Sequence, residues 1–292
     1  MSGAISLSEA APIRGPSPAA AVHGVGGVSF VGVDGKTRLN RLTQRDPIRV
    51  LFPNAARGDI PTAVFVTTSG GLVGGDVLEL SADAGECAAV AVMAQAAEKI
   101  YRSTGTDCRI DVTLKAAANA WLEWLPQETI AFEGARLIRR TRAEVAPGGQ
   151  LLAGEFLVLG RRAMGERMTK GLIRDDWEIR RDGRLIWADA LRLDGNIAEL
   201  TDHPATLDGA TAVATIVFVG DRAGDHLATA RSILAGGGDN VRTGATVVNG
   251  VLLVRILAVE PHDARRAFGA FWTAFRHAVA GLQAVMPRLW TI

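Results

Sequence analysis

The sequence predicts a mainly β protein. Three observations lead to this fold class: short segments in which apolar and polar residues alternate, Asp-Gly and Asn-Gly dipeptides between them, and a strand-and-turn spacing that continues for about two hundred residues. Such a series is typical of two packed sheets, of a barrel or of a β-solenoid. With 292 residues and 48% hydrophobic side chains, the chain is long and apolar enough to bury a large core.

The strands are expected to begin after a tail. Residues 1–22 contain many Ala, Ser and Pro residues and no basic region followed by an apolar stretch, so we interpret them as a disordered tail and not as a signal peptide. Residues 23–292 are interpreted as one domain, because no linker rich in Pro, Gly or Ser divides them. Residues 28–33 and 38–42 predict the first two strands, with Asp34-Gly35 as the turn between them.

The middle of the chain continues this pattern. Residues 63–66 and 77–81 predict strands on either side of a glycine-rich segment. Residues 88–93 form an almost continuous apolar run, which is typical of a strand buried on both faces. Further strands are predicted over residues 109–114, 136–145, 150–159, 177–181 and 185–193, with Asp182-Gly183 as another hairpin turn.

The C-terminal third mixes strands with two predicted helices. Residues 213–219 predict a buried strand, Asp221 is expected to cap a helix that ends at residues 236–238, and Asn249-Gly250 is expected to form a hairpin turn. Pro261 is expected to open a second helix that stops before Pro287. Its apolar stripe is interpreted as core packing, with a partner-binding groove as the alternative, and consists of Ala264, Phe268, Phe271, Phe275, Val279 and Leu282.

Composition excludes several functional classes. A net charge of +1 and 5% aromatic residues argue against a nucleic-acid partner, which requires a basic face or a stacking platform. No apolar run approaches the roughly 18 residues that span a bilayer, so we expect no membrane insertion. Two cysteines provide neither a disulfide framework nor a zinc-ligand spacing. A cytoplasmic protein is therefore expected.

The most unusual segment contains two glycine pairs and a carboxylate, in the order Gly70, Gly71, Leu72, Val73, Gly74, Gly75 and Asp76. Glycine is costly to order, so four of them predict a backbone that turns tightly or approaches another group closely. The segment lies between two predicted strands and lacks the Gly-Lys-Ser/Thr ending and the following helix of a nucleotide-binding loop. We therefore interpret it as a tight connection that delivers Asp76 to the start of a strand.

No catalytic constellation is visible in the sequence. The five histidines are scattered, and neither a nucleophile elbow nor an activated cysteine is present. Carboxylates occupy unusual turn positions at Asp76, Glu128, Glu133 and Glu166. Each is either a carboxylate that stabilises a turn or a salt bridge, or one member of an acid–base pair. For Glu166 the neighbouring Arg167 suggests a salt bridge. These residues alone predict a β-rich protein without a recognisable active site.

Several of these segments, in this order, resemble the UreD (UreH) family of urease accessory proteins. The glycine segment resembles the family's Gly-Gly-hydrophobic-Val-Gly-Gly-Asp signature, and the segment with Lys99, Tyr101 and Arg102 is similar to its Ala-Thr-Lys-Phe-Tyr-Arg-Ser motif. Residues 125–135, which include Pro126, Gln127 and Glu128, resemble a Leu-Pro-Gln-Glu-Thr-Ile run with an acidic residue, here Glu133, before Gly-Ala. Two further blocks, residues 165–167 and 191–195, also match. This chain differs in having Ser69 for proline, Glu98 for threonine and Met168 for an aromatic residue.

The resemblance implies a fold and a function. The implied fold is a helically wound structure of stacked β-sheets, similar to a β-solenoid, with a pair of helices. The implied function is that of a metallocentre-assembly chaperone and not of an enzyme: it binds apo-urease, recruits a helical UreF-type partner and through it a UreG-type GTPase, and helps deliver nickel. A polar internal passage for the ion is also implied, with transient Ni²⁺ and no tightly bound cofactor.

The carboxylates fit that role chemically. Imidazole or thiolate clusters would hold Ni²⁺ tightly, whereas scattered carboxylates, carbonyls and water release it readily. We therefore hypothesise that Asp76, with Glu128, Glu133 and Glu166 as further candidates, lines or opens the passage. Two other hypotheses remain: a purely structural adaptor that does not touch metal, and a hydrolase with a carboxylate site at Glu128 or Glu166.

Overall fold

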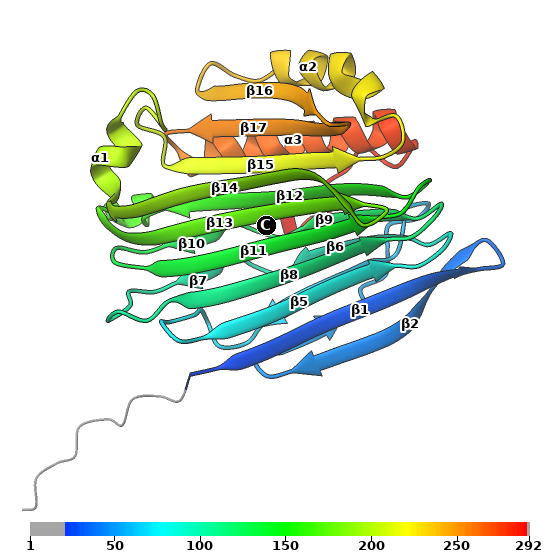
Figure 1. The fold of residues 1–292 in the computed structure, drawn as a ribbon, viewed down its shortest axis with the longest axis horizontal. Coiled ribbons are helices and arrows are strands. Elements are labelled where there is room, and N and C mark those ends of the chain that lie inside the picture. Colours follow the sequence, from blue (N-terminus) through cyan, green and yellow to red (C-terminus); the bar gives the residue numbers. More distant parts are fainter. Residues whose placement is uncertain (1–20, 291–292) are drawn as a thin grey trace, which may run out of the picture.

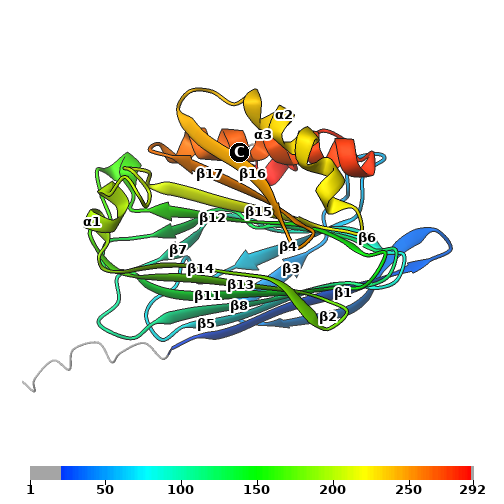
Figure 2. The ribbon, with the colours of Figure 1, turned by 45° about the horizontal axis from the view of Figure 1, so that its top comes forward.

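The computed structural model describes residues 21–290. The tail predicted over residues 1–22 falls mainly on residues 1–20, which lie outside the described residues. Within the described part, two large sheets face each other, and helices cover the outer side of one of them (Figures 1 and 2). The predicted β class is therefore confirmed.

Seven strands form the first sheet, hereafter sheet A. In spatial order they are β14 (Arg184–Asn196), β13 (Lys170–Arg181), β11 (Arg136–Val145), β8 (Cys108–Ala116), β5 (Val77–Ala84), β1 (His23–Val33) and β2 (Lys36–Arg45).

Ten strands form the second sheet, hereafter sheet B. Eight lie in the order β16 (Val241–Val248), β17 (Val251–Ala258), β15 (Ala212–Val219), β12 (Gln150–Leu159), β9 (Trp121–Leu125), β6 (Ala89–Ala94), β4 (Thr62–Thr67) and β3 (Ile48–Leu51). The short strands β7 (Glu98–Ile100) and β10 (Thr129–Ala131) pair with each other, and β10 also pairs with β12.

The chain winds helically between the two sheets. It passes from β4 in sheet B to β5 in sheet A, back to β6, on to β8, and so through β9, β11, β12 and β13, with parallel pairing between successive coils in each sheet. The result is a β-solenoid of about four turns. Alternation of apolar and polar residues alone permitted two packed sheets, a barrel or a β-solenoid. The helically wound fold that the family resemblance implied is confirmed.

Antiparallel hairpins extend the coil at its margins. The turns at Asp34, Asp182 and Asn249 have φ angles of 51°, 51° and 49°, in the left-handed region that Asp and Asn tolerate before glycine. They join β1 to β2, β13 to β14 and β16 to β17. All three predicted hairpin turns are therefore confirmed.

Helices follow the main coil. They are α1 (Ile197–Asp202), α2 (Leu227–Ala235) and α3 (Pro261–Ala280), with short 3₁₀ turns η1 (Arg162–Met164), η2 (Ala223–His226) and η3 (Arg288–Trp290). Two of the three α-helices, α2 and α3, are the predicted C-terminal pair. None of the described helices is both long enough and apolar enough to cross a bilayer.

The predicted cap of the first C-terminal helix was wrong. Asp221 does not bond to the start of α2, which begins at Leu227 after the η2 turn. The Asp221 carboxylate instead accepts a hydrogen bond from the Gly148 N–H and pairs with Arg181. A carboxylate close to a basic side chain of a neighbouring hairpin gains more from that charge than from a helix end.

Sheet B separates two cores. One lies between the sheets, and the other lies between sheet B and α3, whose side chains Phe268, Phe271, Trp272 and Phe275 are buried. Because sheet B is covered on both faces, β6 is apolar along its length, as predicted for residues 88–93. Burying each large apolar side chain of this kind stabilises the fold by about 1.5–3 kcal/mol.

Candidate functional site

The family-like motifs lie together as stacked rungs at one end of the solenoid. The Leu72 N–H donates to the Lys99 carbonyl and the Tyr101 N–H to the Leu72 carbonyl, both at 2.8 Å. The following coil stacks on this one through the hydrogen bond that the Phe132 N–H donates to the Ile100 carbonyl at 3.0 Å. The order of the motifs in the sequence is therefore the order of the coils in the fold.

The glycines permit the coils to come this close. A Cβ atom on Gly71 would lie 2.4 Å from the Tyr101 ring, and one on Gly74 would lie 2.2 Å from the Ser103 hydroxyl. The segment that contains them crosses from sheet B to sheet A, since it joins β4 to β5. Its glycines therefore serve a close approach of the backbone to the next coil.

Asp76 stabilises that crossing. Its carboxylate accepts one hydrogen bond from the Val73 N–H and one from the Val22 N–H, both at 2.8 Å, and the residue is only 3% exposed. This geometry is that of the turn carboxylate considered from the sequence. A contact of Asp76 with nickel stays a prediction.

Glu133 and Glu166 are brought side by side. The Glu133 N–H donates to Glu166 Oε1 at 3.1 Å, and the Glu133 carboxylate accepts from the Thr169 N–H and hydroxyl at 2.5 and 2.7 Å. Burial by itself would raise the pKa of Glu133, but the bonds from Thr169 lower it. The hydrogen bond from Arg161 is the main cause of the lowered pKa of Glu166. Both carboxylates are thus ionised and held by the chain itself.

Arg167 has a different partner from the one considered in the sequence. Its guanidinium donates to the Thr201 hydroxyl at 3.1 Å and pairs with Asp202, which fastens α1 to this end of the solenoid. Glu166 pairs instead with Arg161, at 2.5 Å. The suggested Glu166–Arg167 salt bridge was therefore wrong.

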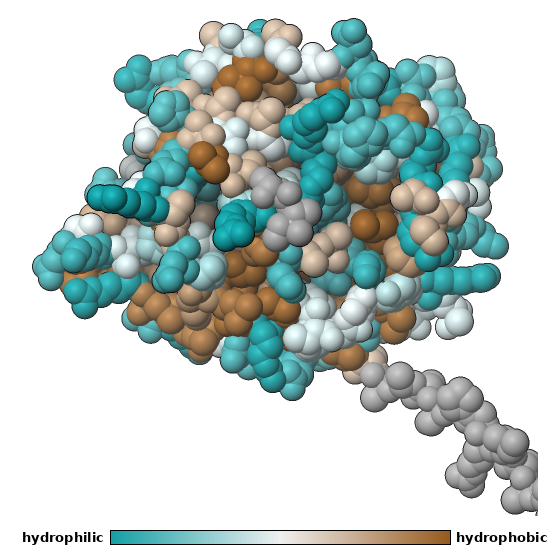
Figure 3. All heavy atoms as spheres, turned by 180° about the vertical axis from the view of Figure 1, so that it is seen from behind, coloured by the Kyte–Doolittle hydropathy of each residue, from teal (hydrophilic) through white to brown (hydrophobic). Residues whose placement is uncertain are grey.

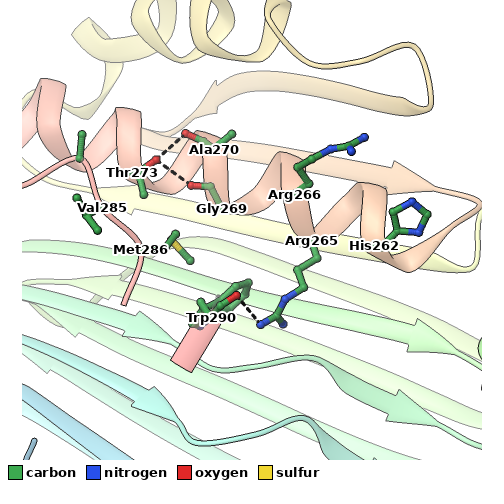
Figure 4. Close-up of a pocket in the computed structure, with 10 residues that line it drawn as sticks. His262, Arg265, Arg266, Gly269, Ala270, Thr273, Val285, Met286 and Trp290 are labelled. Atoms are coloured by element: carbon green, nitrogen blue, oxygen red, sulfur yellow. Dashed lines mark hydrogen bonds between the residues drawn. The ribbon is translucent and has the colours of Figure 1, made fainter. Parts of the chain in front are cut away.

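Glu128 lies elsewhere, beneath α3 and the C-terminal segment. Arg265 donates to Glu128 Oε2 at 2.5 Å, to Gln127 Oε1 at 2.8 Å and to the Trp290 carbonyl at 2.9 Å. Figure 4 shows Arg265 reaching from α3 towards Trp290 along a groove of about 530 Å³. A second surface hollow of about 450 Å³, which we call the vestibule, lies on the other side of Arg265 and is also lined by Ala96, Gln127 and Glu128.

An ion cluster that the sequence did not predict lies between the sheets. Arg139 on β11 contacts both carboxylate oxygens of Asp175 on β13, at 2.9 and 2.6 Å, and Glu155 on β12 at 2.6 Å. Burial would lower the pKa of Arg139, but Asp175 and Glu155 raise it, so the guanidinium stays charged. Burial raises the pKa of Glu155, and Arg139 opposes that shift.

Two cavities flank this cluster. The larger, hereafter the inter-sheet cavity, has about 50 Å³ of free volume and is lined by Glu98, Thr67, Thr129, Arg139 and Glu155 among others. Such a volume holds a few water molecules. Ala96 and Gln127 line both this cavity and the vestibule, so the two are neighbours. Pro126 lies on the cavity wall as well.

The smaller cavity continues the polar line beyond Glu155. It has about 10 Å³ of free volume, and its walls include Asp175, Trp177, Asp189 and Arg255. The Trp177 indole N–H is buried and has no hydrogen-bond partner among the described residues, so a water molecule is the natural acceptor there. Asp189 pairs with Arg255, and both side chains are partly exposed. A chain of polar groups therefore extends from the vestibule, across the interior, to the partly exposed pair of Asp189 and Arg255.

The donor set of this line is made of oxygen. Within residues 21–290, no group of three or more His, Cys, Asp or Glu side chains could hold a metal ion. The four carboxylates predicted from the sequence do not form one site either: Glu133 and Glu166 are together, whereas Asp76 and Glu128 lie apart from them. Divalent cations would meet carboxylates, hydroxyls and water here, and oxygen ligands of this kind exchange readily.

One sequence signal could have revealed the missed residues. Glu155 stands alone in the apolar strand Gln150–Leu159, and Glu123 stands alone in Trp121–Leu125. A single charge in a strand buried on both faces must find a partner, because an unpaired buried charge is very costly. The identity of that partner could not be deduced from the strand itself.

Comparison with known proteins places nearly the whole chain in one family. A family model described as UreD urease accessory protein matches residues 23–291. The urease accessory protein UreD of Magnetococcus marinus is 43% identical over 279 residues, which cover 94% of this chain and 96% of that protein. UreD of Rhodopseudomonas palustris is 43% identical over 274 residues, with 93% and 92% covered. Urease accessory protein UreD 2 of Methylorubrum populi is 41% identical over 260 residues, with 89% and 86% covered.

Proposed function

Because the chain belongs to the UreD family of urease accessory proteins, we propose that it acts in urease maturation as a chaperone of nickel-centre assembly. In this proposal nickel is the cargo, and it passes through the polar line between sheets A and B on its way to apo-urease. The protein is not an enzyme in this role. It takes up the ion from a complex of a UreF-type helical partner and a UreG-type GTPase.

The observation that carries the proposal is the ion cluster of Arg139, Glu155 and Asp175 with a cavity on each side. Burying three charges contributes little stability, since well-packed apolar residues of similar volume do as well or better. The charged side chains and the cavities therefore occupy positions that would hold apolar side chains if stability alone determined the core. A passage for a hydrated cation requires both the charges and the cavities.

Arg139 has a defined effect on such a passage. It neutralises part of the charge of Glu155 and Asp175, so that a cation arriving between them is not trapped. The carboxylates still offer oxygen atoms to a hydrated ion, and the hydroxyls of Thr129 and Thr215 lie on the same line. Weak oxygen ligation with water suits transfer, whereas a storage site would use several imidazoles or thiolates.

Partner binding is the second half of the proposal. The face opposite the view of Figure 1 carries hydrophobic patches among hydrophilic residues (Figure 3), and Leu51 and Phe52 are among the exposed large apolar side chains, at 55% and 42%. Exposed apolar patches of this kind support association with other proteins. Apo-urease and the UreF-type protein are the partners that we propose.

Co-expression with urease and the accessory partners tests the passage. Glu155→Gln keeps the hydrogen bond from Trp124 but removes the charge, and Ala94→Leu narrows the inter-sheet cavity. We expect both variants to co-purify with the complex, while the nickel content of the urease falls several-fold. Asp194→Asn, which changes an exposed pair with Arg192, is the matched control and should leave the nickel content unchanged.

The same experiment separates the alternatives. If the interior variants load urease with as much nickel as the unchanged protein, the chain is a structural adaptor and the passage is refuted. A hydrolase would show turnover by the isolated chain that disappears with Glu128→Gln or Glu166→Gln. The geometry supports that reading least, since Arg265 holds Glu128 and Arg161 holds Glu166.

A further inference from the structure

We propose that Glu98 is the cation-binding group at the mouth of the inter-sheet cavity, where it takes a hydrated divalent cation from the vestibule. This inference rests on the proposed function, since it names a group that a nickel ion would meet where the vestibule adjoins the inter-sheet cavity. At this position the family motif that the segment resembles has threonine, whereas this chain has glutamate.

The first argument is an unbalanced charge. Two carboxylates line the inter-sheet cavity, and Glu155 is paired with Arg139 at 2.6 Å. Glu98 accepts a hydrogen bond from the Thr67 hydroxyl at 2.6 Å, but no Lys, Arg or His of residues 21–290 forms an ion pair with it. A half-buried carboxylate in this position binds either a proton or a cation from solution.

The second argument is access. Glu98 follows directly after Ala96 and Ala97, which line the vestibule, and Ala96 also lines the inter-sheet cavity. An ion that enters from the vestibule therefore reaches Glu98 at the cavity wall. Arg139, on the opposite sheet, lines the same cavity, but its charge is already paired with Glu155 and Asp175.

The groups around Glu98 leave its charge uncompensated. Lys99 is exposed on the same strand, and its charge lowers the pKa of Glu98 only in part. Glu128, whose carbonyl accepts the Glu98 N–H, has its own carboxylate engaged by Arg265. Burial dominates and raises the pKa of Glu98 to about 7, in agreement with a carboxylate that lacks a countercharge.

The ligand set fits a weak and reversible site. Glu98 supplies one carboxylate, Thr67 a hydroxyl oxygen, and water the remaining ligands in a cavity of about 50 Å³. A divalent ion held by one carboxylate and several waters exchanges easily. Such a site concentrates the cation at the entrance and does not retain it.

Titration of the full chain with Ni²⁺ tests the site, with the signals of backbone amides followed by NMR. Paramagnetic broadening should centre on Thr67, Glu98 and Thr129. In Glu98→Thr and Glu98→Gln we expect the affinity at this place to fall about tenfold or more, which is the effect of losing about 1.4 kcal/mol of binding. Glu178→Gln, at a partly exposed glutamate on β13 that pairs with Arg180, is the control and should bind like the unchanged chain.

The outcomes distinguish this inference from the proposed function. Equal broadening in wild type and Glu98→Gln, or none around Glu98 in wild type, overturns the site while leaving the passage standing. Loss of broadening in both Glu98 variants supports the site even where co-expressed urease receives no nickel, a result that would refute the proposed function instead. Because removal of an uncompensated charge favours folding, the Glu98 variants are expected to fold.

Discussion

Buried charged side chains lie on both faces of sheet B, but their surroundings differ. On the α3 side, Glu123 is held by Arg276 at 2.9 Å and by the Trp121 indole, and Asp59 completes the cluster. Stacked rings of Phe268, Trp272 and Trp290 fill the space around it. On the side that faces sheet A, the charges of Arg139, Glu155 and Asp175 are also paired, yet cavities lie beside them and Glu98 has no cationic partner.

The difference teaches that a buried charge does not by itself mark function. Glu123 and Arg276 are as buried as Glu155 and Arg139, and a compensated pair in a filled core is explained by packing and docking of α3. What distinguishes the inter-sheet side is the combination of charge with empty polar volume and one unbalanced carboxylate. Four substitutions test and sharpen this comparison.

The largest effect is expected from Arg139→Met. It leaves the buried carboxylates of Glu155 and Asp175 without their cationic partner, which should cost about 3–5 kcal/mol in the free energy of unfolding. Phe268→Ala, on the α3 side, should cost a similar amount, about 3–5 kcal/mol, through a cavity in a filled core. Urea denaturation measures both.

The two variants should differ at acidic pH. Burial raises the pKa of Glu155, so its protonation at acidic pH relieves part of the loss in Arg139→Met but has no effect on the Phe268→Ala cavity. If the two losses had the same pH dependence, the contrast between the two cores would be wrong.

Glu98→Thr should stabilise the protein by an amount that depends on pH. The folded-state pKa is raised from 4.5 to about 7, so the wild type is most stable relative to the variant below pH 4.5. As the pH rises from 4.5 to about 7, the unfolded chain loses the Glu98 proton first and the wild type loses stability. Above that range the variant should gain up to about 3 kcal/mol relative to its value at low pH.

Thermal or urea unfolding at a series of pH values measures this gain. Glu178→Gln, at a partly exposed glutamate, should show no comparable trend. A gain of the same size at every pH would mean that Glu98 has the same pKa in the folded and the unfolded chain, which contradicts an uncompensated buried charge.

The smallest effect is expected from Asp76→Asn. The side chain keeps one oxygen acceptor for the Val73 N–H but places an amide donor against the Val22 N–H, which should cost about 1–3 kcal/mol. If Asp76 is a turn carboxylate, nickel loading of urease should fall only as far as the amount of folded protein does. Nickel content per folded complex measures this, and a specific loss at normal stability would assign Asp76 to the ion's route.

Local patterns predicted much of the fold. Asp34-Gly35, Asp182-Gly183 and Asn249-Gly250 adopt the turns that these dipeptides favour, and Pro261 opens α3 as expected. The failures were also local in kind. The sequence around Asp221 predicts a helix cap, but in the fold Asp221 pairs with Arg181 of another hairpin. The sequence likewise predicts a pair of Glu166 and Arg167, but Arg167 pairs with Asp202 of α1.

The candidate site was predicted only in part. Pro126, Gln127 and Glu128 do lie around the cavity and its vestibule. The ion cluster was not predicted because β12 is buried on both faces. Alternation of apolar and polar residues therefore could not show that the Glu155 side chain lies on the face of β12 that packs against sheet A.

The sequence by itself determined the β class, the hairpin turns, the two C-terminal helices and, through its ordered motifs, the family. Each of these depends on residues close together along the chain. The tertiary structure decided that Arg139, Glu155 and Asp175 meet and that Glu98 faces a cavity. Arg139 and Asp175 are 36 residues apart and become neighbours only because successive coils stack in parallel, with one strand of each coil in either sheet. Contacts of this kind depend on how many residues each coil contains, and no local pattern encodes that number.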